Sequence, residues 1–316
     1  MIMSETRQEI QLAIVIPAYK AKYLPETLDS LVAQTDKRFH VYIGDDKSPE
    51  DIETIVKRYE GKINFVYKRF EENLGGKDLV AQWERCIDMT RGEDWIWLFS
   101  DDDYMDATCV EAFYKELAKS HVNYDLFRFN LNITNNKEIS NTPTVPNLVT
   151  PTFLFKKKME GKCPVFAVEY IFSRKIYEQQ GRFQNFDLAW HSDIATWMKF
   201  GLNGIVTIPG PKVTWRSSGE NITTKSDENI NKRKWSATVD FFVWIRQFFA
   251  DNNYRLNTYV DTTFIRVFHG ITRNLPQQYC IETAKPYLGK GTRRNLILFS
   301  IKMYEACSSF LRLFNR

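Results

Sequence analysis

The sequence predicts an α/β protein built on a doubly wound, mostly parallel sheet, followed by a C-terminal helical extension. Over the first 130 residues, short apolar runs alternate with stretches in which apolar residues recur at helical spacing. This is the pattern of strands that helices cover on both faces. From about residue 226 the strand pattern fades and aromatic residues at helical spacing replace it. We therefore expect two domains, at residues 10–225 and 226–316.

Each expected element follows from a local pattern. Apolar runs predict strands at residues 12–17, 39–44, 63–67, 95–99, 165–173 and 213–216. Apolar residues at helical spacing predict helices at residues 24–32, 51–59, 79–87 and 192–202. Pro25 suits the first turn of a helix, and Ser48 with Asp51 is a predicted capping pair.

Composition excludes several classes of protein. The 316 residues are 43% hydrophobic, with 43 Lys and Arg against 39 Asp and Glu and a net charge of +4. This excludes a disordered polar chain, and the even charge balance gives no reason to expect a nucleic-acid partner. The five cysteines form no CxxC pair, which argues against a zinc cage and a disulfide framework. With no secretory signal in residues 1–9 and no apolar run of about 20 residues, we expect a cytoplasmic protein, soluble or peripheral to a membrane.

Acidic residues follow two of the predicted strands. In a parallel sheet, ligands bind at the carboxyl ends of the strands, where this chain carries Tyr19, the pair Asp45-Asp46 and the run Ser100 to Asp103. Five carboxylates at one edge repel each other unless cations or hydrogen bonds compensate. Helix capping explains a single Asp but not three in a row. A divalent cation bound to a diphosphate fits the pattern best.

Other phosphate-binding patterns are absent or weak. No GxGxxG follows the first strand and no GxxxxGK[ST] occurs, which argues against hydride transfer and ATP hydrolysis. The stretch Asn73 to Lys77 places two glycines before a helix that bears an early lysine, an arrangement compatible with phosphate binding. Two adjacent glycines more often simply make a turn, so this stretch alone decides nothing.

Taken together, these motifs resemble family 2 glycosyltransferases of the GT-A fold. Pro17-Ala18-Tyr19, the Asp-Asp pair, the Asn73 to Gly75 turn and Asp101 with Asp103 follow in the family's order over roughly residues 10–220. The resemblance implies a catalytic domain at residues 10–225. It implies transfer of a sugar from a nucleotide diphosphate, expected to be UDP, to an acceptor hydroxyl with inversion. Mn²⁺ or Mg²⁺ is the implied cofactor, and synthesis of a polysaccharide or surface glycan is the implied role.

The resemblance also implies how the nucleotide is held. Pro17 and Tyr19 would pack around the nucleoside, with the Tyr19 ring against the base. Asp46, or its neighbour Asp45, would accept a hydrogen bond from the base, and Lys77 would lie near the diphosphate.

In the acidic run, the resemblance places Asp102 against the ribose and Asp103 on the metal. Three consecutive aspartates leave the frame of the motif open by one residue. Asp101 therefore stays a candidate for both the nucleotide and the metal.

The resemblance assigns the catalytic base to Asp193. The pair Ser192-Asp193 stands where the family often has Glu-Asp before a helix. The first turn of a helix favours any carboxylate, so a plain capping role stays open. His191 is a competing base because its ordinary pKa lies nearer neutrality. With the family pattern, His191 and Trp190 become expected acceptor contacts or packed side chains.

The segment after residue 216 is the expected loop over the diphosphate. Arg216 and the pair Ser217-Ser218 would serve there, with a solvated linker as the alternative. Relatives often place a metal-binding His in this loop, and this loop has none. A third protein ligand for the metal is therefore left open, and water could fill the position.

Two other functions stay open. A sugar nucleotidyltransferase would carry a Gly-rich basic loop after Ile16, which this chain lacks. A nucleotide-sugar-binding protein without catalysis is compatible with Ser192 and with the missing His. The sequence does not decide which sugar, acceptor or linkage is used.

The last predicted helix, residues 293–316, mixes aromatic and apolar residues with arginine and lysine. Such a helix can lie in a membrane interface, which would suit a lipid-linked glycan acceptor. The alternatives are a helix packed on the catalytic domain or across a homodimer.

Overall fold

The computed structural model describes residues 12–119 and 124–314, with the side chains of the last helix described to Met303. The strands are, in chain order, β1 Leu12–Ala18, β2 Phe39–Asp45, β3 Phe65–Arg69, β4 Trp95–Leu98, β5 Tyr104–Met105, β6 Leu126–Thr134, β7 Ile139–Asn141, β8 Leu148–Val149, β9 Tyr170–Ser173 and β10 Ile205–Arg216. The helices are α1 Leu24–Val32, α2 Ile52–Lys57, α3 Leu79–Ile87, α4 Cys109–Lys119, α5 Pro151–Met159, α6 Arg174–Gln179, η1 Asp187–Ala189, α7 Ser192–Phe200, α8 Glu228–Asp251, α9 Asn257–Ile271, α10 Gln277–Thr283, α11 Lys285–Leu288 and α12 Thr292–Phe314.

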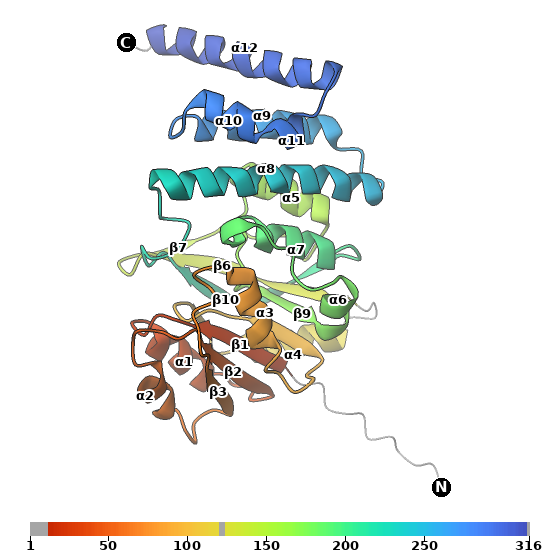
Figure 1. Cartoon of the computed structure of the whole chain (residues 1–316). Helices are drawn as coiled ribbons and strands as arrows, with labels where there is room; N and C mark the ends of the chain where they lie inside the picture. Colours follow the sequence, from red (N-terminus) through yellow and green to blue (C-terminus); the bar gives the residue numbers. More distant parts are fainter. Residues whose placement is uncertain (1–11, 120–123, 315–316) are drawn as a thin grey trace. The chain divides into compact units, whose positions relative to one another are not determined.

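One mixed sheet organises the first part of the chain (Figure 1), with strand order β3-β2-β1-β4-β9-β6-β10-β5. Strands β3, β2, β1 and β4 are parallel neighbours, as predicted. Strand β9 then enters antiparallel to both β4 and β6. Because β9 runs the other way, its first residues lie at the carboxyl end of β4. This reversal brings a later part of the chain to the edge that carries the acidic run.

The core explains why these segments form strands. Leu12 to Ile16 of β1 have no exposed surface, because α1 and α4 cover one face of the sheet and α3 lies on the other. A strand buried on both faces reads as a continuous apolar run. The strand expected from residue 165 begins only at Tyr170. The carbonyls of Phe166 and Val168 accept from the Trp197 and Trp97 indoles, at 2.8 and 2.7 Å, instead of entering the ladder.

Helix caps follow the predictions in part. Asp51 caps α2, and its carboxylate accepts from the Thr54 N–H at 3.1 Å. Ser48, the other half of the predicted capping pair, instead donates its hydroxyl to the Tyr19 carbonyl at 2.6 Å. The Ser48 side chain therefore ties two loops of the carboxyl edge together.

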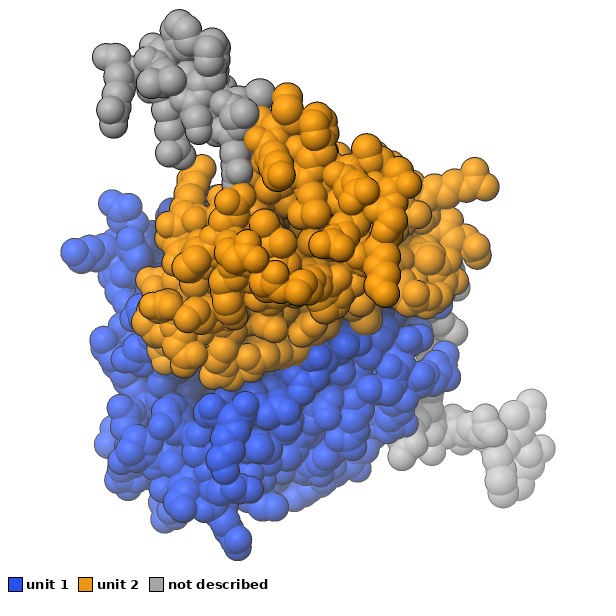
Figure 2. All heavy atoms as spheres, turned by 45° about the horizontal axis from the view of Figure 1, so that its top comes forward, with its two compact units in different colours: residues 1–185, 192–221 blue, residues 186–191, 222–316 orange. Residues whose placement is uncertain are grey.

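The chain divides into two compact units, coloured separately in Figure 2. The first comprises residues 1–185 and 192–221, and the second comprises residues 186–191 and 222–316. The sequence places this boundary at residue 225 and does not anticipate that residues 186–191 group with the helical unit.

The second unit is built on α8. This helix buries Trp235, Phe242 and Phe249, and the later helices pack on it and on one another. Helix α12 contacts α9 and α11 and buries Ile297 and Ile301. Within the described residues, none of the helices combines the length and the apolar character that crossing a membrane requires.

Gly44, the residue before Asp45, tests how tightly the carboxyl edge is packed. A Cβ at this position would lie 2.4 Å from Cys86 Sγ and 2.9 Å from Phe70 Cε2. We expect Gly44→Ala to lower the free energy of unfolding by about 1–3 kcal/mol, as overpacking does. Urea denaturation measures this. Gly270→Ala is the control, because a Cβ there meets no atom within 4 Å and should raise stability by up to about 1 kcal/mol. Equal midpoints for Gly44→Ala and the parent chain would contradict the packing.

Candidate functional site

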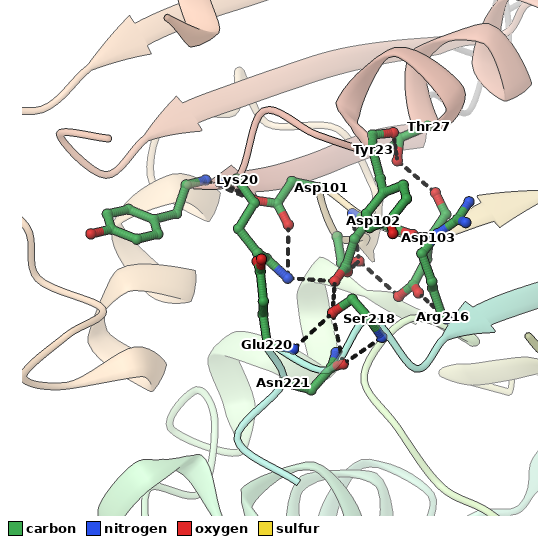
Figure 3. Close-up of polar contacts among 12 residues, drawn as sticks. Lys20, Tyr23, Thr27, Asp101, Asp102, Asp103, Arg216, Ser218, Glu220 and Asn221 are labelled. Carbon is green, nitrogen blue, oxygen red and sulfur yellow. Dashed lines mark hydrogen bonds and ion pairs between the residues drawn. The ribbon is translucent and has the colours of Figure 1, made fainter. Parts of the chain in front are cut away.

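An acidic turn, Ser100 to Asp103, follows β4 at the carboxyl edge of the sheet (Figure 3). Its three aspartates are all buried, with 4% or less of each residue exposed. Burying adjacent carboxylates is costly unless each finds donors or a cation. The contacts of this turn therefore decide what the edge can bind.

Lys20 supplies a cation to the turn from the loop after β1. Its ammonium hydrogen-bonds Asp102 Oδ2 and lies 3.5 Å from Asp101 Oδ1. The backbone N–H groups of Tyr19 and Lys20 both donate to the other Asp101 oxygen at 2.7 Å. The Asp101 carboxylate thus joins the first loop to the acidic turn, and the sequence analysis did not single out Lys20.

Asp103 points into the protein. Its Oδ1 accepts from the Arg216 N–H and its Oδ2 from the Ser100 hydroxyl, both at 2.7 Å. The Arg216 Nε donates to the Asp102 carbonyl at 2.8 Å, and its guanidinium lies 4.2 Å from the centroid of the Tyr23 ring. Asp103 and Arg216, predicted on a metal and over a diphosphate, are thus placed in contacts that hold the turn itself.

The charged groups of the turn shift one another's pKa values. Burial raises the pKa of Asp101 to about 6, although Lys20 opposes the shift. Burial also raises the pKa of Asp103 well above its usual range, and Asp102 adds to the shift. Burial acts to lower the pKa of the Lys20 ammonium, but Asp101 and Asp102 together raise it. The ammonium thus stays charged between the two carboxylates.

The donor set at the turn fits a divalent cation in part. Within the described ranges, no three His, Cys, Asp or Glu side chains converge as a complete metal cage. Asp101 Oδ1 and Asp102 Oδ2, however, both face the Lys20 ammonium, which marks a place where a cation is stabilised. One or two carboxylates with substrate phosphates are the ligands that Mg²⁺ usually takes.

The pair Asp45-Asp46 is committed to protein donors. Asp45, with no exposed surface, accepts from the Ser48 N–H at 2.8 Å and from Tyr67 and Arg69 at 2.7 Å each. It therefore holds the loop after β2 against the end of β3. The Arg69 side chain is 44% exposed and carries positive charge at this edge.

Asp46 organises the Asn73 to Gly75 turn. Its Oδ1 accepts from the Leu74 N–H at 2.7 Å, and its Oδ2 accepts from the Gly75 N–H at 2.8 Å. Asn73 and Arg85 donate to the same carboxylate. These four donors together fill the roughly four acceptor positions of a carboxylate. A Cβ at Gly75 would lie 2.7 Å from Asp46 Oδ2. The glycine is therefore needed for the close approach of this turn to Asp46.

The other predicted nucleotide contacts, Pro17, Tyr19 and Lys77, do not hydrogen-bond the Asp45 or Asp46 carboxylates. Pro17 pairs with Gly44 within the sheet, and Tyr19, just beyond, is 44% exposed. Lys77 lies on the surface and pairs with Glu72 at 3.3 Å. The structure thus brings Tyr19 to the acidic turn through its backbone and leaves its ring accessible.

Asp193 lies in the first turn of α7. This helix packs beside the start of β9, since the Trp197 indole donates to the Phe166 carbonyl at 2.8 Å and its ring stacks on Tyr170 at 4.5 Å between centroids. Asp193 Oδ1 accepts from the Ile194 N–H at 2.7 Å. Burial raises the pKa of the Asp193 carboxyl, and Lys158 opposes the shift. These observations are compatible both with Asp193 as a helix-capping carboxylate and with Asp193 as a base.

A buried contact between Arg128 and Glu169 was not anticipated by the sequence analysis. Arg128 of β6 places Nη2 3.8 Å from Glu169 Oε1, and 1% or less of either residue is exposed. Burial raises the pKa of Glu169 to about 8, against the opposing effect of Arg128. A polar residue within the apolar run of β6 was the available signal.

Trp190 and His191 belong to the second unit. The Trp190 indole and the His191 Nε2 both lie 3.1 Å from the Thr238 hydroxyl of α8. The His191 ring stacks on Phe241 at 4.7 Å between centroids. Both rings therefore pack on α8.

Comparisons with known proteins agree with this fold. The family description "Glycosyl transferase family 2" matches residues 13–181, more than half of the chain. An uncharacterised glycosyltransferase of Rickettsia prowazekii is 36% identical over 94 residues, which are 29% of this chain and 27% of that protein. The chain thus spans about a quarter of the length of the curated relatives it matches.

Two solved structures confirm the predicted GT-A fold. TarS of S. aureus, in complex with UDP-GlcNAc, has a TM-score of 0.59 at 15% identity and covers 94% of this chain and 92% of its own. The mannosyltransferase PcManGT of Pyrobaculum calidifontis, in complex with GDP-Man and Mn²⁺, has a TM-score of 0.51 at 14% identity, covering 97% and 88%. At these identities the likeness shows the fold alone.

Glu169 makes stability depend on pH. Its folded pKa, about 8, lies above the ordinary value of 4.5, so the folded chain keeps a proton that the unfolded chain loses. Stability should therefore fall as pH rises from about 4.5 to about 8. In Glu169→Gln this loss disappears, so its melting temperature relative to the parent chain should rise by more than about 3 °C between pH 5 and 8. Calorimetry measures the difference, and Glu71→Gln, at an exposed site, controls for the loss of one carboxylate. A difference independent of pH would contradict the prediction.

Proposed function

Because the chain belongs to glycosyl transferase family 2, we propose that it moves a sugar from a nucleoside diphosphate, a UDP-sugar, to an acceptor hydroxyl with inversion. The observation that carries the proposal is the position of two acidic groups at one sheet edge. The turn Asp101 to Asp103 follows β4, and Asp193 lies in the first turn of α7, which packs on the start of β9 beside β4. The turn would bind the cation that stabilises the departing diphosphate, and Asp193 would accept the proton of the attacking hydroxyl.

The donor pocket is proposed around the exposed Tyr19 ring. An accessible aromatic ring beside the acidic turn offers a stacking surface for a base, and TarS, which shares the fold, holds UDP-GlcNAc. Asp45 and Asp46 would hold the surrounding loops in place, since protein donors hydrogen-bond their carboxylates. Arg69 would supply positive charge near the nucleotide.

The metal is proposed on Asp102 with Asp101, in place of the predicted Asp103. Both Asp103 oxygens accept from protein donors, whereas the other two aspartates face a cation already. A Mn²⁺ or Mg²⁺ bound there would offset the charge that develops on the departing diphosphate. PcManGT, of the same fold, holds Mn²⁺.

Asp193 is the proposed base. The acceptor oxygen forms a bond to the anomeric carbon, the bond from that carbon to the diphosphate oxygen breaks, and the hydroxyl proton passes to Asp193. Burial raises the pKa of this carboxyl, which makes its ionised form a stronger base. One base suffices because the diphosphate leaves without a protein acid, unlike hydrolysis between two carboxylates.

Replacing the two acidic groups tests this function. We expect Asp193→Asn and Asp102→Asn each to lower turnover by a factor of about 10² or more, measured as UDP release from a panel of UDP-sugars. Asp88→Asn is the control, because Asp88 is 52% exposed and pairs with Arg182 away from the turn. Full activity in Asp193→Asn would exclude the base assignment. No UDP release by the parent chain with any donor would favour a binding protein without catalysis.

The acceptor is proposed to be a glycan carried on a lipid. In α12, Leu296 and Phe299 are each 61% exposed and Met303 is 48% exposed. They lie at helical spacing on the face opposite the buried Ile297 and Ile301. We name these three residues the α12 apolar stripe. Lys302 is the residue before Met303 in this helix, and an exposed apolar stripe with a basic neighbour would suit an anionic lipid interface.

Substitution of the stripe tests membrane binding. The double variant Leu296→Ser/Phe299→Ser should lose most of its co-sedimentation with anionic vesicles, because the two side chains supply the apolar contact. Val243→Ser, at a 39% exposed apolar position of α8, is the control and should sediment like the parent chain. If the parent chain stays in the supernatant and the double variant changes its mass by light scattering, the stripe is instead a homodimer contact.

A further inference from the structure

We propose that Lys20 is the counter-cation of the donor-free site: a divalent metal must displace its ammonium, which then binds the donor's diphosphate. This inference rests on the proposed function, because it assigns the chain's own residue a part in donor and metal binding. Lys20 thereby becomes a positioning residue that couples the two binding steps.

The geometry places Lys20 where a metal would lie. Its ammonium contacts Asp102 Oδ2 and lies 3.5 Å from Asp101 Oδ1 (Figure 3). These are the oxygens of the two carboxylates that are not taken by the backbone N–H groups of the first loop or by Ser100. An ammonium and a divalent cation cannot share this place, since both need the same two oxygens and repel each other.

The Lys20 side chain can move away from the carboxylates while the Lys20 backbone stays in place. The Lys20 N–H donates to Asp101 Oδ2 at 2.7 Å, which anchors the loop. The side chain is 25% exposed, so its ammonium can turn to solvent by a change of rotamer. The Asp102 oxygen that it contacts also accepts from the Ser218 hydroxyl at 3.2 Å and so keeps one partner after the exchange.

The neighbouring cation cannot take this part. The Arg216 guanidinium donates to the Asp102 carbonyl and pairs with Glu26, and 4% of the residue is exposed. Among the described cations that contact the turn, Lys20 is therefore the mobile one. A diphosphate brings several negative charges to the site, and an ammonium released beside it gains a charge-assisted hydrogen bond.

The exchange predicts opposite effects on two affinities. Without donor, Lys20→Met should bind Mn²⁺ at least about tenfold more tightly than the parent chain, because the competing charge is gone. With saturating Mn²⁺, the same variant should bind UDP several-fold more weakly, because the diphosphate loses a partner. Electron paramagnetic resonance of free Mn²⁺ measures the first affinity and calorimetric titration of UDP the second.

Two control variants separate charge from position. Lys20→Arg keeps the cation and should bind Mn²⁺ with the affinity of the parent chain. Lys22→Met removes an exposed lysine two residues away, whose ammonium lies 4.8 Å from the centroid of the Tyr23 ring, and should change neither affinity.

Stability gives a readout that needs no activity. Removing the ammonium leaves the buried carboxylates uncompensated, so Lys20→Met should melt below the parent chain, and Mn²⁺ should raise its melting temperature more than that of the parent chain. If Lys20→Met does not fold, Lys20→Gln, which keeps a donor without the charge, takes its place in all measurements.

The outcomes distinguish this inference from the proposed function. Mn²⁺ affinities of the parent chain and Lys20→Met that agree within twofold would overturn the exchange and leave the glycosyltransferase proposal standing. Failure of Lys20→Met to bind Mn²⁺ would overturn the exchange as well. Failure of every variant and of the parent chain to bind UDP would instead count against the donor assignment.

Discussion

The compensation of three consecutive buried carboxylates holds the carboxyl edge of this protein together. Asp101 takes two backbone N–H groups from the loop after β1, Asp102 takes the Lys20 ammonium, and Asp103 takes the N–H of Arg216 at the end of β10. Asp101 and Asp102 thus reach the loop after β1, and Asp103 reaches the end of β10. An uncompensated buried charge costs several kcal/mol. The turn therefore holds these segments in place, and together they form the carboxyl edge.

The other acidic pair shows that position alone does not make a carboxylate available to a ligand. Asp45 and Asp46 also follow a strand at this edge, yet their oxygens accept from the loops around them. They keep Ser48, Arg69 and the Asn73 to Gly75 turn in place. Fixed protein donors take the oxygens of Asp45 and Asp46, whereas one oxygen of Asp101 and one of Asp102 face the Lys20 ammonium.

The antiparallel strand β9 gives the edge its second acidic group. It starts beside the end of β4, and α7, which carries Asp193, packs on its first residue, Tyr170, through Trp197. Burial raises the pKa of both Glu169 and Asp193. The edge thus carries a turn whose charge Lys20 compensates and, in Asp193, a buried carboxyl whose raised pKa makes its ionised form a stronger base.

Continuous apolar runs and strand-end aspartates are local patterns, and they predicted the order of strands and helices up to β4 and the acidic turn after it. The resemblance to family 2 glycosyltransferases predicted the GT-A fold. The sequence also predicted Asp193 at the start of a helix, where α7 begins. It did not predict that Lys20 faces Asp101 and Asp102, that Asp103 turns inward to Arg216, or that Arg128 pairs with Glu169. Each of these pairs joins residues 41 or more positions apart. Their contacts depend on how β1, β9 and β10 line up across the sheet, and only the tertiary structure decides that register, because local patterns carry no record of which distant donor meets a buried carboxylate.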